Sequence, residues 1–487
     1  MASNAAAKES KSPPGVVQFS AELEPLVRLI ERTPREKCFE MIVDQLRRGV
    51  SYRQFVASLF LAGVRDIRPQ PPGFKFHCVF VIHAAHQLSL DAAAGDRLLP
   101  HLWALDNFKE SQERDIKEGD FHLSPAQGGL PAASSAWNEF HSAMETWDEE
   151  RADRAIITLF RTRGANEIID GLWLYGARDY RNIGHKAIFV ASFWRTLQTI
   201  GWQHAEPALR SLVSGLLGYG ASEEVNGYAY DDQCYPPNLV LARKAASRLP
   251  ADWAETGLEA GGTGDILEAI RASSTDDACK EAARQLTTGQ AHASNVWDSA
   301  HLAAGELMMR NPGVFGLHAV TSINALHYAF RTAGNHQTRL LILLQATGWM
   351  SQFANFMSKS EEFGSTKITD LAQTTREGSS NKDDLREEIL GSLATKRVEA
   401  ARKAYRLAEI DPDPTRFRRA AQSLLLRKAA EVHDFKYAAA IFEDYALVSP
   451  KWRPAMLATA VYNLRSSGHP DSEVMQQARE SLRSLRA

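Results

Sequence analysis

An all-helical fold is predicted by three features of the 487-residue sequence. Apolar residues recur at spacings of three and four over most of the chain, which is the period of an amphipathic helix. Two segments, 74–93 and 184–202, are apolar almost all round, so each is expected to be a central helix. No segment alternates polar and apolar residues between turn dipeptides, so little or no sheet is expected.

The helices expected before the middle of the chain are separated by turn signals. Ser51 is expected to cap the helix that follows it, residues 117–135 read as a loop because they carry Gly, Pro and Ser, and Gly201 is expected to end the second central helix. The expected helices cover residues 22–34, 35–50, 51–64, 74–93, 97–115, 136–162, 184–202 and 204–220.

The second half has the same helical period between two irregular stretches. Residues 219–264 are rich in Gly, Asp and Pro and are expected to be irregular, and helices are expected over 264–288, 296–310, 316–334 and 337–357. The predicted organisation is a flexible leader over 1–17, a helical core domain over 18–357, a polar Ser/Thr-rich linker or exposed insertion over 358–383, and a C-terminal helical region of four or five helices over 384–487 that completes the site.

Composition excludes several classes of protein. The formal net charge is −3, from 56 basic and 59 acidic residues, so no nucleic-acid partner is expected. No stretch reaches about 18 consecutive apolar residues, so no membrane span is expected. The four cysteines form no CxxC pair, and the first residues lack the apolar core of a signal peptide, so a cytoplasmic location is expected.

Common catalytic motifs are missing. The sequence has no dinucleotide-binding GxGxxG after a strand, no P-loop, no GxSxG and no HExxH. The "HAAH" at 83–86 lacks the glutamate base of HExxH and has a different spacing. Asp298 and His301 share a helix face, but Glu306 lies off it, so a di-iron carboxylate site is not favoured.

Four helical segments carry histidines among apolar neighbours: 74–90, 184–200, 316–330 and 430–447. A single histidine of this kind is most often a core residue hydrogen-bonded to a carbonyl or carboxylate. Four such segments favour a metal site instead, because imidazoles that converge inside a helical bundle are a common way to bind a metal.

Helical phase ranks some of these histidines. His318 shares its face with the small residues Thr321, Ser322 and Ala325, which leaves room for a metal or ligand. His327 lies nine residues further on, about half a turn away, so it is expected to be structural. Spacing also pairs His83 with His86, whereas His77 faces elsewhere.

The last segment contains "EVHDFKYAAA", where His433 and Lys436 are three residues apart and therefore face the same way. A lysine in a helix buried over most of its circumference has its charged form destabilised, and a neutral amine is a nucleophile. One of its fates is reaction with carbon dioxide to give a carbamate, an anionic metal ligand. The alternative is a polar helix edge that carries both residues to water.

His185 begins its helix, and Lys186 beside it is expected to be a solvated or capping charge.

Four segments resemble the questin oxidase-like family. "GLHAVTSINALHYAF" (316–330) is similar to the family's "LLHAVTGxxAL", and "IGHKAIFVASFWRTL" (183–197) to its "FHPLIHLAYAL". "EVHDFKYAAAIFEDYAL" (431–447) is similar to "DEHxIKLxxACLREYAL", and "GFKFH" (73–77) to an early "GFxNH". The motifs occur in the family's order and span most of residues 73–447.

The resemblance implies an all-helical, Fe(II)-dependent oxygenase that uses O2 to open a ring of an aromatic polyketide or quinone-like substrate. Its metal is held by four histidines and a carboxylated lysine. Carried onto this sequence, the ligands are His77, His185, His318, His433 and Lys436. His83 and His86 remain alternatives to His77. Ser322, Trp194, Tyr328 and Trp349 are expected to line the substrate pocket.

Two departures concern residues next to the expected ligands. The second histidine of the family's "FHPLIH" is Phe189 here, and the asparagine of its "GFxNH" is Phe76. Two other functions stay open at this point: a zinc-dependent hydrolase that uses the same metal site to activate water, and a non-catalytic helical scaffold that binds a partner.

Overall fold

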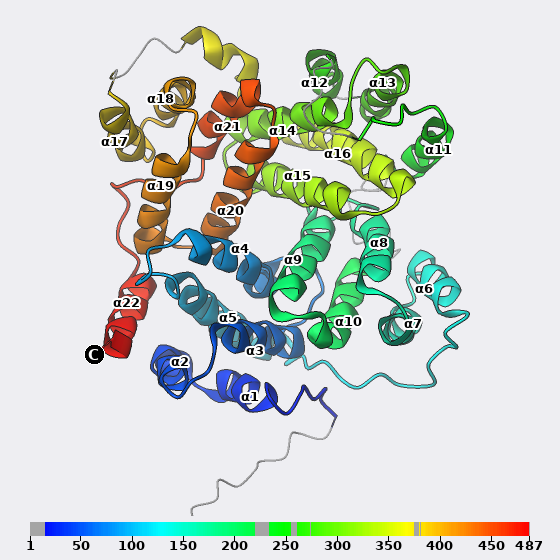
Figure 1. Cartoon of the computed structure of the whole chain (residues 1–487), viewed down its shortest axis with the longest axis vertical. Helices are drawn as coiled ribbons and strands as arrows, with labels where there is room; N and C mark the ends of the chain where they lie inside the picture. Colours follow the sequence, from blue (N-terminus) through cyan, green and yellow to red (C-terminus); the bar gives the residue numbers. More distant parts are fainter. Residues whose placement is uncertain are drawn as a thin grey trace, which may run out of the picture.

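The computed structural model describes residues 15–219, 233–254, 261–272, 274–374, 379 and 381–486. Over these residues the chain forms 22 α-helices joined by loops and short 3-10 helices, with no strand (Figure 1). The predicted all-helical class is confirmed. No helix among the described residues is long and apolar enough to cross a membrane.

Four helices form a central ring (Figure 1). They are α4 (His77–Asp91), α9 (His185–Ile200), α15 (Val314–Thr332) and α20 (Val432–Leu447). Each contacts the next, from α4 to α9 to α15 to α20 and back to α4. The two segments expected at the centre, 74–93 and 184–202, supply two of these helices because their side chains are apolar on nearly every face.

The other helices of the first half surround the ring. They are α1 (Glu24–Arg32), α2 (Cys38–Arg47), α3 (Tyr52–Asp66), α5 (Leu99–Glu118), α6 (Ala136–Glu145), α7 (Glu149–Thr162), α8 (Ala165–Gly176) and α10 (Ala205–Leu216). Ser51 caps α3 in a capping box with Gln54. The segment 136–162, expected as one helix, is two: Trp147 has a positive φ of 57°, and the Asp148 carboxylate caps α7.

The second half adds ten outer helices within the part of the chain that the structure describes. They are α11 (Tyr235–Ala246), α12 (Thr263–Arg271), α13 (Thr275–Thr288), α14 (Ala293–Arg310), α16 (His336–Met357), α17 (Lys382–Ser392), α18 (Arg397–Ile410), α19 (Thr415–Lys428), α21 (Arg453–Ala460) and α22 (Glu473–Arg486). Helix α11 lies where irregular chain was expected. Its prolines occupy the first turn, where a missing backbone N–H costs nothing. Residues 220–232 and 255–260 of that stretch lie outside the described residues.

The polar stretch 358–383 is attached to the helical body over part of its length. Its 3-10 helix η5 (Ile368–Thr374) buries Ile368 and Leu371, and the Ile368 N–H donates to the Glu306 carboxylate of α14 at 3.0 Å. Residues 375–378 and 380 lie outside the described residues, as do residues 1–14 of the expected leader. Six helices, α17–α22, follow this stretch, whereas four or five were expected.

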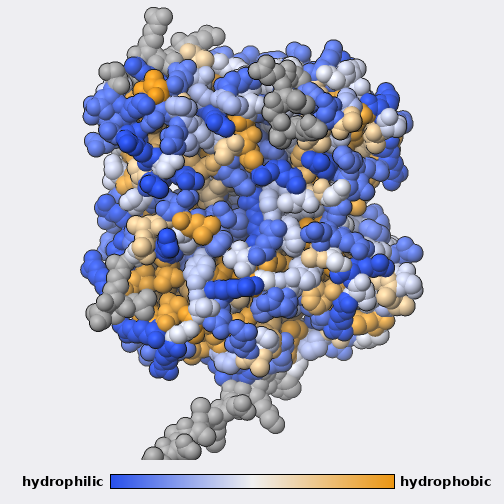
Figure 2. Space-filling model, viewed as in Figure 1, coloured by the Kyte–Doolittle hydropathy of each residue, from blue (hydrophilic) through white to orange (hydrophobic). Residues whose placement is uncertain are grey.

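The C-terminal helices close the structure onto its N-terminal part. Helix α20 enters the central ring, and α22 packs against α2 and α5 (Figure 1). The face shown in Figure 2 is mostly hydrophilic, and its hydrophobic residues gather mainly toward the lower left. The apolar side chains of the central ring are therefore covered by the outer helices.

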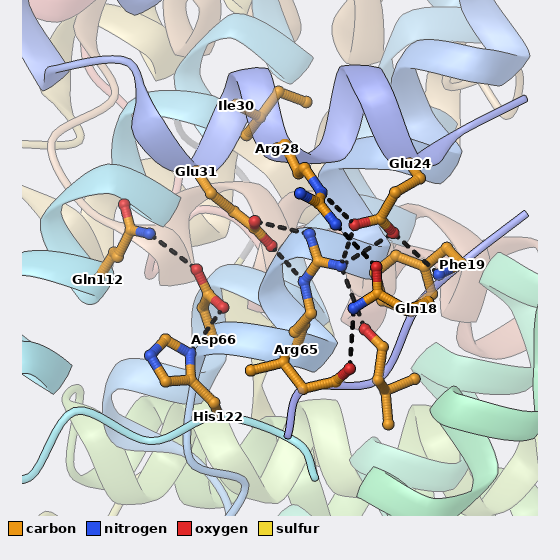
Figure 3. A network of polar contacts seen from close by, with 12 residues as sticks. Gln18, Phe19, Glu24, Arg28, Ile30, Glu31, Arg65, Asp66, Gln112 and His122 are labelled. Atoms are coloured by element: carbon orange, nitrogen blue, oxygen red, sulfur yellow. Dashed lines mark hydrogen bonds and ion pairs between the residues drawn. The ribbon is translucent and has the colours of Figure 1, made fainter. Parts of the chain in front are cut away.

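A buried ion-pair network fixes α1 against α3 (Figure 3). The Arg65 guanidinium, 3% exposed, forms two bonds with the Glu31 carboxylate at 2.6 and 2.7 Å and two with that of Glu24 at 2.8 and 2.9 Å. It also lies 4.6 Å from the centre of the Phe19 ring. Arg65 is therefore the counter-charge of Glu31 and shares Glu24 with Arg28, whose Nε lies 2.6 Å from the Glu24 carboxylate.

We expect Arg65→Met to destabilise the protein by about 3–5 kcal/mol, because it leaves the buried Glu31 carboxylate unpaired and removes one of the two partners of Glu24. The matched control is Arg48→Met at the C-cap of α2: the Arg48 side chain is 69% exposed and pairs with Asp44, so the cost should be at most about 1 kcal/mol. Midpoints of urea unfolding measure both effects. Equal midpoints for the two variants would contradict this account of the network.

Candidate metal centre

The four helices of the ring bring their N-terminal ends to one layer of histidines. His77 and His185 are the first residues of α4 and α9, His433 is the second residue of α20, and His318 follows the start of α15 by four residues. The histidines come from four different helices, and all four side chains meet at the same end of the ring. The four helices therefore run in the same direction away from this layer.

The ring nitrogens of the layer lie within ligand distance of one another. The Nε2 atom of His185 lies 2.9 Å from Nε2 of His77 and 3.0 Å from Nε2 of His318. One ligand atom each from His77, His318 and His433 also lie within 4.8 Å of one another. The ring centres of His77 and His433 are 4.9 Å apart. These four residues are the histidines to which the family motifs assign the metal.

Each Nδ1 atom faces an oxygen acceptor on the outer side of the layer. The contacts are His77 with Phe74 O at 2.8 Å, His185 with Asn182 O at 2.5 Å, His318 with Val314 O at 2.7 Å, and His433 with the Glu431 carboxylate at 3.2 Å. A carbonyl or carboxylate oxygen only accepts hydrogen bonds, so Nδ1 carries the proton in each ring. The neutral rings then present bare Nε2 lone pairs to one another, as metal-binding histidines do.

Protonation of the rings does not remove the close contact between their lone pairs. Burial lowers the pKa of His77, His185 and His318 well below the usual value, so their charged forms are disfavoured at neutral pH. The Nε2 atom of His433 is buried and has no hydrogen-bond partner. Lone pairs that face one another are satisfied by a cation, and the four imidazoles fit a divalent metal ion.

Lys436 lies one turn beyond His433 on α20. It is 6% exposed, its Nζ atom has no hydrogen-bond partner, and that atom lies 5.6 Å from the centre of the Phe80 ring. Burial lowers the pKa of Lys436 to about 7, so the neutral amine is available near neutral pH. Helical side chains lean toward the N-terminus of their helix, which directs Lys436 toward the histidine layer.

Two glycines keep the layer open. Gly73 has a φ of +99°, and a Cβ atom there would lie 2.8 Å from the Nε2 of His185. Gly184 has a φ of +84°, and its Cβ would lie 2.7 Å from that of Ser322. Both positions combine a left-handed backbone with a close approach that only glycine permits. The chain thus leaves space beside the nitrogens where a metal would be held.

A cavity of about 860 Å³ opens from the layer toward the surface. All four histidines line it, together with six aromatic side chains: Phe74, Trp103, Tyr180, Tyr219, Phe315 and Phe356. Its volume lies within the range of small-molecule sites. The centre is therefore reached through a chamber rich in aromatic side chains, which also carries charged residues such as Lys75, Glu110 and Arg181.

One face of α5 supplies a wall of this cavity that the sequence did not reveal. Trp103, Asn107, Ser111 and Arg114 recur at helical spacing and all line it. The Asn107 Oδ1 atom is buried without a hydrogen-bond partner. In the sequence these polar residues resemble a solvated helix face, and no local pattern distinguishes a face that meets a cavity from one that meets water.

The two histidines kept as alternatives to His77 lie further along α4. His83 accepts a hydrogen bond at Nε2 from Arg195 at 3.1 Å, and the Nδ1 atom of His86 is bonded to the Tyr52 hydroxyl at 2.8 Å. The structure brings neither into the cluster. His77 joins it because α4 begins at that residue and its ring projects from the helix end.

The four residues expected to wall the substrate pocket do not line the large cavity. Ser322 and Trp349 are fully buried in packing behind Gly184. Trp194 lines a separate surface hollow, and the Tyr328 ring is covered by the Arg195 guanidinium at 3.9 Å. The expectation took aromatic residues near the motifs as pocket walls, whereas these side chains point to other neighbours of their helices.

Lys186 and His327 both lie outside the histidine layer, with partners of their own. Lys186 is not solvated: it is fully buried and its Nζ pairs with Asp179 at 2.9 Å. His327 lies outside the cluster, as its helical phase predicts, and its Nδ1 is 2.8 Å from the Nε2 of His301.

No protein-family model, curated protein or solved structure matches this chain. Function is therefore inferred from the chemistry of the site and from the sequence motifs.

We expect the stability of metal-free protein, kept free of carbon dioxide, to rise with pH between about 7 and 10.5, partly through Lys436. In that range the unfolded chain holds a proton on this amine that the folded chain lacks, so raising the pH favours folding by up to about 1.4 kcal/mol per pH unit. Lys436→Met should flatten the profile by this amount. Urea unfolding at several pH values measures it, and parallel profiles would show that the folded protein keeps Lys436 charged.

Proposed function

We propose that this protein is a mononuclear non-heme iron oxygenase that acts with O2 on an apolar aromatic small molecule. The observation that carries the proposal is the set of four bare Nε2 atoms with an unpaired lysine beside them, at the inner end of an aromatic cavity. The proposed ligands are His77, His185, His318, His433 and Lys436 as its carbamate.

Iron is favoured over zinc by the number and kind of ligands. Structural and catalytic zinc sites are mostly four-coordinate, with three or four protein ligands. Four imidazoles and one anionic oxygen exceed that number, and the hard oxygen of a carbamate suits iron. Ferrous iron, when bound, supplies the activation of dioxygen.

The residues of this chain prepare the substrate for that chemistry. Trp103, Phe315 and Phe356 offer aromatic surface for a planar ring system within the cavity. The buried Oδ1 of Asn107 is available to accept a hydrogen bond from a substrate hydroxyl. The carbonyl acceptors at Nδ1 of His77, His185 and His318, and the Glu431 carboxylate at Nδ1 of His433, hold the imidazoles in one tautomer, so the ligand set does not reorganise when the substrate binds.

The resemblance to questin oxidase-like proteins supports the same reading, including ring cleavage of a polyketide or quinone. The two departures from the family motifs are in contact with each other: the ring centres of Phe76 and Phe189 are 4.9 Å apart. Both are fully buried. We infer that a polar pair in the family has been replaced here by an apolar pair, which leaves the histidine layer unchanged.

A non-catalytic scaffold that binds a partner would have no reason to bury unsatisfied polar groups at its centre. The Nε2 atom of each imidazole and the unpaired Nζ of Lys436 lose hydration without a compensating bond, at roughly 1–3 kcal/mol per unsatisfied group. A partner-binding scaffold gains nothing from that loss at its centre, whereas metal binding recovers it.

We expect protein purified from iron-supplemented cells without chelators to contain close to one iron per chain, measured by elemental analysis. His77→Ala and His318→Ala should lose most of this metal because each removes a ligand. The matched control for the first is His86→Ala on the same helix, which lies outside the cluster and should retain it.

Stoichiometric zinc in place of iron would instead support the hydrolase alternative. A wild-type protein without bound metal, or variants that all retain it, would overturn the metal centre.

A further inference from the structure

A second, smaller cavity of about 50 Å³ lies along the axis of the central ring, on the other side of the histidine layer from the large cavity. Its lining follows one rule: each of the four helices contributes the residue three positions after its histidine. These residues are Phe80, Ile188, Thr321 and Lys436. The rule holds because the four helices run in parallel, so equal steps along each chain reach the same depth.

The next layer of the lining consists largely of alanine. Ala84, Ala191, Ala325, Ala439 and Ala440 lie six or seven positions after their histidines. Small side chains at this depth on all four helices are what leave the axis open. The resulting space admits a molecule of two or three heavy atoms and excludes an aromatic substrate.

Lys436 faces this axial cavity and does not line the large one. Four atoms of its lining residues are buried without hydrogen-bond partners: the Nζ of Lys436, the Oγ1 of Thr321, the Nδ1 of His83 and the Nε of Arg195. Lys436 and Thr321 are more than nine-tenths buried. One turn beyond the histidines, an amine and a hydroxyl thus face a small chamber with their bonding capacity unused, and the polar side chains of Ser192 and Asn324 line the next turn.

The far end of the cavity is closed by Arg195. Its guanidinium pairs with Glu443 at 2.9 Å and donates to His83 at 3.1 Å. The Arg195 and Glu443 side chains are 11% and 30% exposed, so this ion pair separates the chamber from the surface. The axial cavity therefore approaches solvent at a place distinct from the aromatic cavity.

We propose that the axial cavity is a carbon dioxide site that supplies the carboxylation of Lys436, independently of the route taken by the aromatic substrate. This rests on the carbamate ligand of the proposed function. Carbon dioxide suits the chamber because it is small, linear and uncharged, and its terminal oxygen can accept the unused hydrogen bond of Thr321.

The reaction is balanced without a redox partner. The lone pair of the neutral Lys436 Nζ forms a bond to the carbon of CO2, and one C=O π pair moves onto oxygen. The nitrogen then loses a proton, so that an amine and CO2 give a carbamate anion and H⁺. The buried, unpartnered Nε2 of His433 is an acceptor for that proton before a metal occupies the layer.

The test follows carbamate formation rather than turnover. Full-length protein stripped of metal is incubated with ¹³C-bicarbonate and equimolar zinc(II), which is diamagnetic, and the lysine carbamate is followed by ¹³C NMR. Wild type should form one carbamate per chain, and Lys436→Met none. Ala325→Leu fills the axial cavity. This variant should form the carbamate about tenfold more slowly, because the leucine side chain has to move aside before carbon dioxide can reach the amine.

Ala430→Leu is the matched control, since Ala430 lines only the large cavity and is exposed; it should carboxylate at the wild-type rate. Ala439→Leu is a second filling variant at a half-buried position, for use if Ala325→Leu does not fold. Filling variants that carboxylate as fast as wild type would overturn the axial site. Zinc bound at one per chain without any carbamate would also overturn it while leaving the metal centre intact, whereas loss of metal binding in wild type would reject the proposed function itself.

Discussion

Four imidazole nitrogens that all lack a proton face one another at the inner end of the large cavity, and the arrangement of the protein depends on this mutual exposure of lone pairs. The backbone carbonyls and the Glu431 carboxylate on the outer side fix the tautomers, and burial lowers the pKa of His77, His185 and His318, so protonation of these three rings does not relieve the contact. Such a layer is stable only with a cation at its centre or with the strong support of the surrounding packing. The outer helices supply that packing around α4, α9, α15 and α20.

The common direction of these four helices gives the centre two different sides. Residues that precede the histidines form the aromatic chamber, and residues that follow them form the narrow axial cavity. A large planar molecule and a small gas can therefore approach from opposite directions without competing for space. Lys436 lines the second side while the histidines open to the first, so under the proposed function the ligand set would be assembled from one side and the substrate bound from the other.

The sequence predicts the helical class and part of the site because both follow from periodicity. His318 is preferred over His327 by helical phase, and the structure places His318 in the histidine layer and His327 outside it. Spacing pairs His433 with Lys436, and the structure places His433 in the layer and Lys436 one turn further along, where it lines the axial cavity. His77 could not be separated from His83 and His86, because the choice depends on where α4 begins. The walls of the large cavity were missed for a different reason: Asn107 and Ser111 face an interior space that only the packing of distant helices creates. The burial of Lys186 could not be predicted from the sequence for the same reason, since the fold alone shows that Asp179 is its partner.

Helix α22 packs on α2 and α5, and α20 just before it completes the central ring. The last two proposed ligands, His433 and Lys436, are therefore synthesised only after most of the polypeptide has left the ribosome. A nascent chain can present at most three of the histidines, in a core that still lacks one of its four walls. Under the proposed function the ligand set is complete only once α20 has been made, and a chain shortened before residue 432 would leave uncovered the faces of α4 and α15 that α20 contacts.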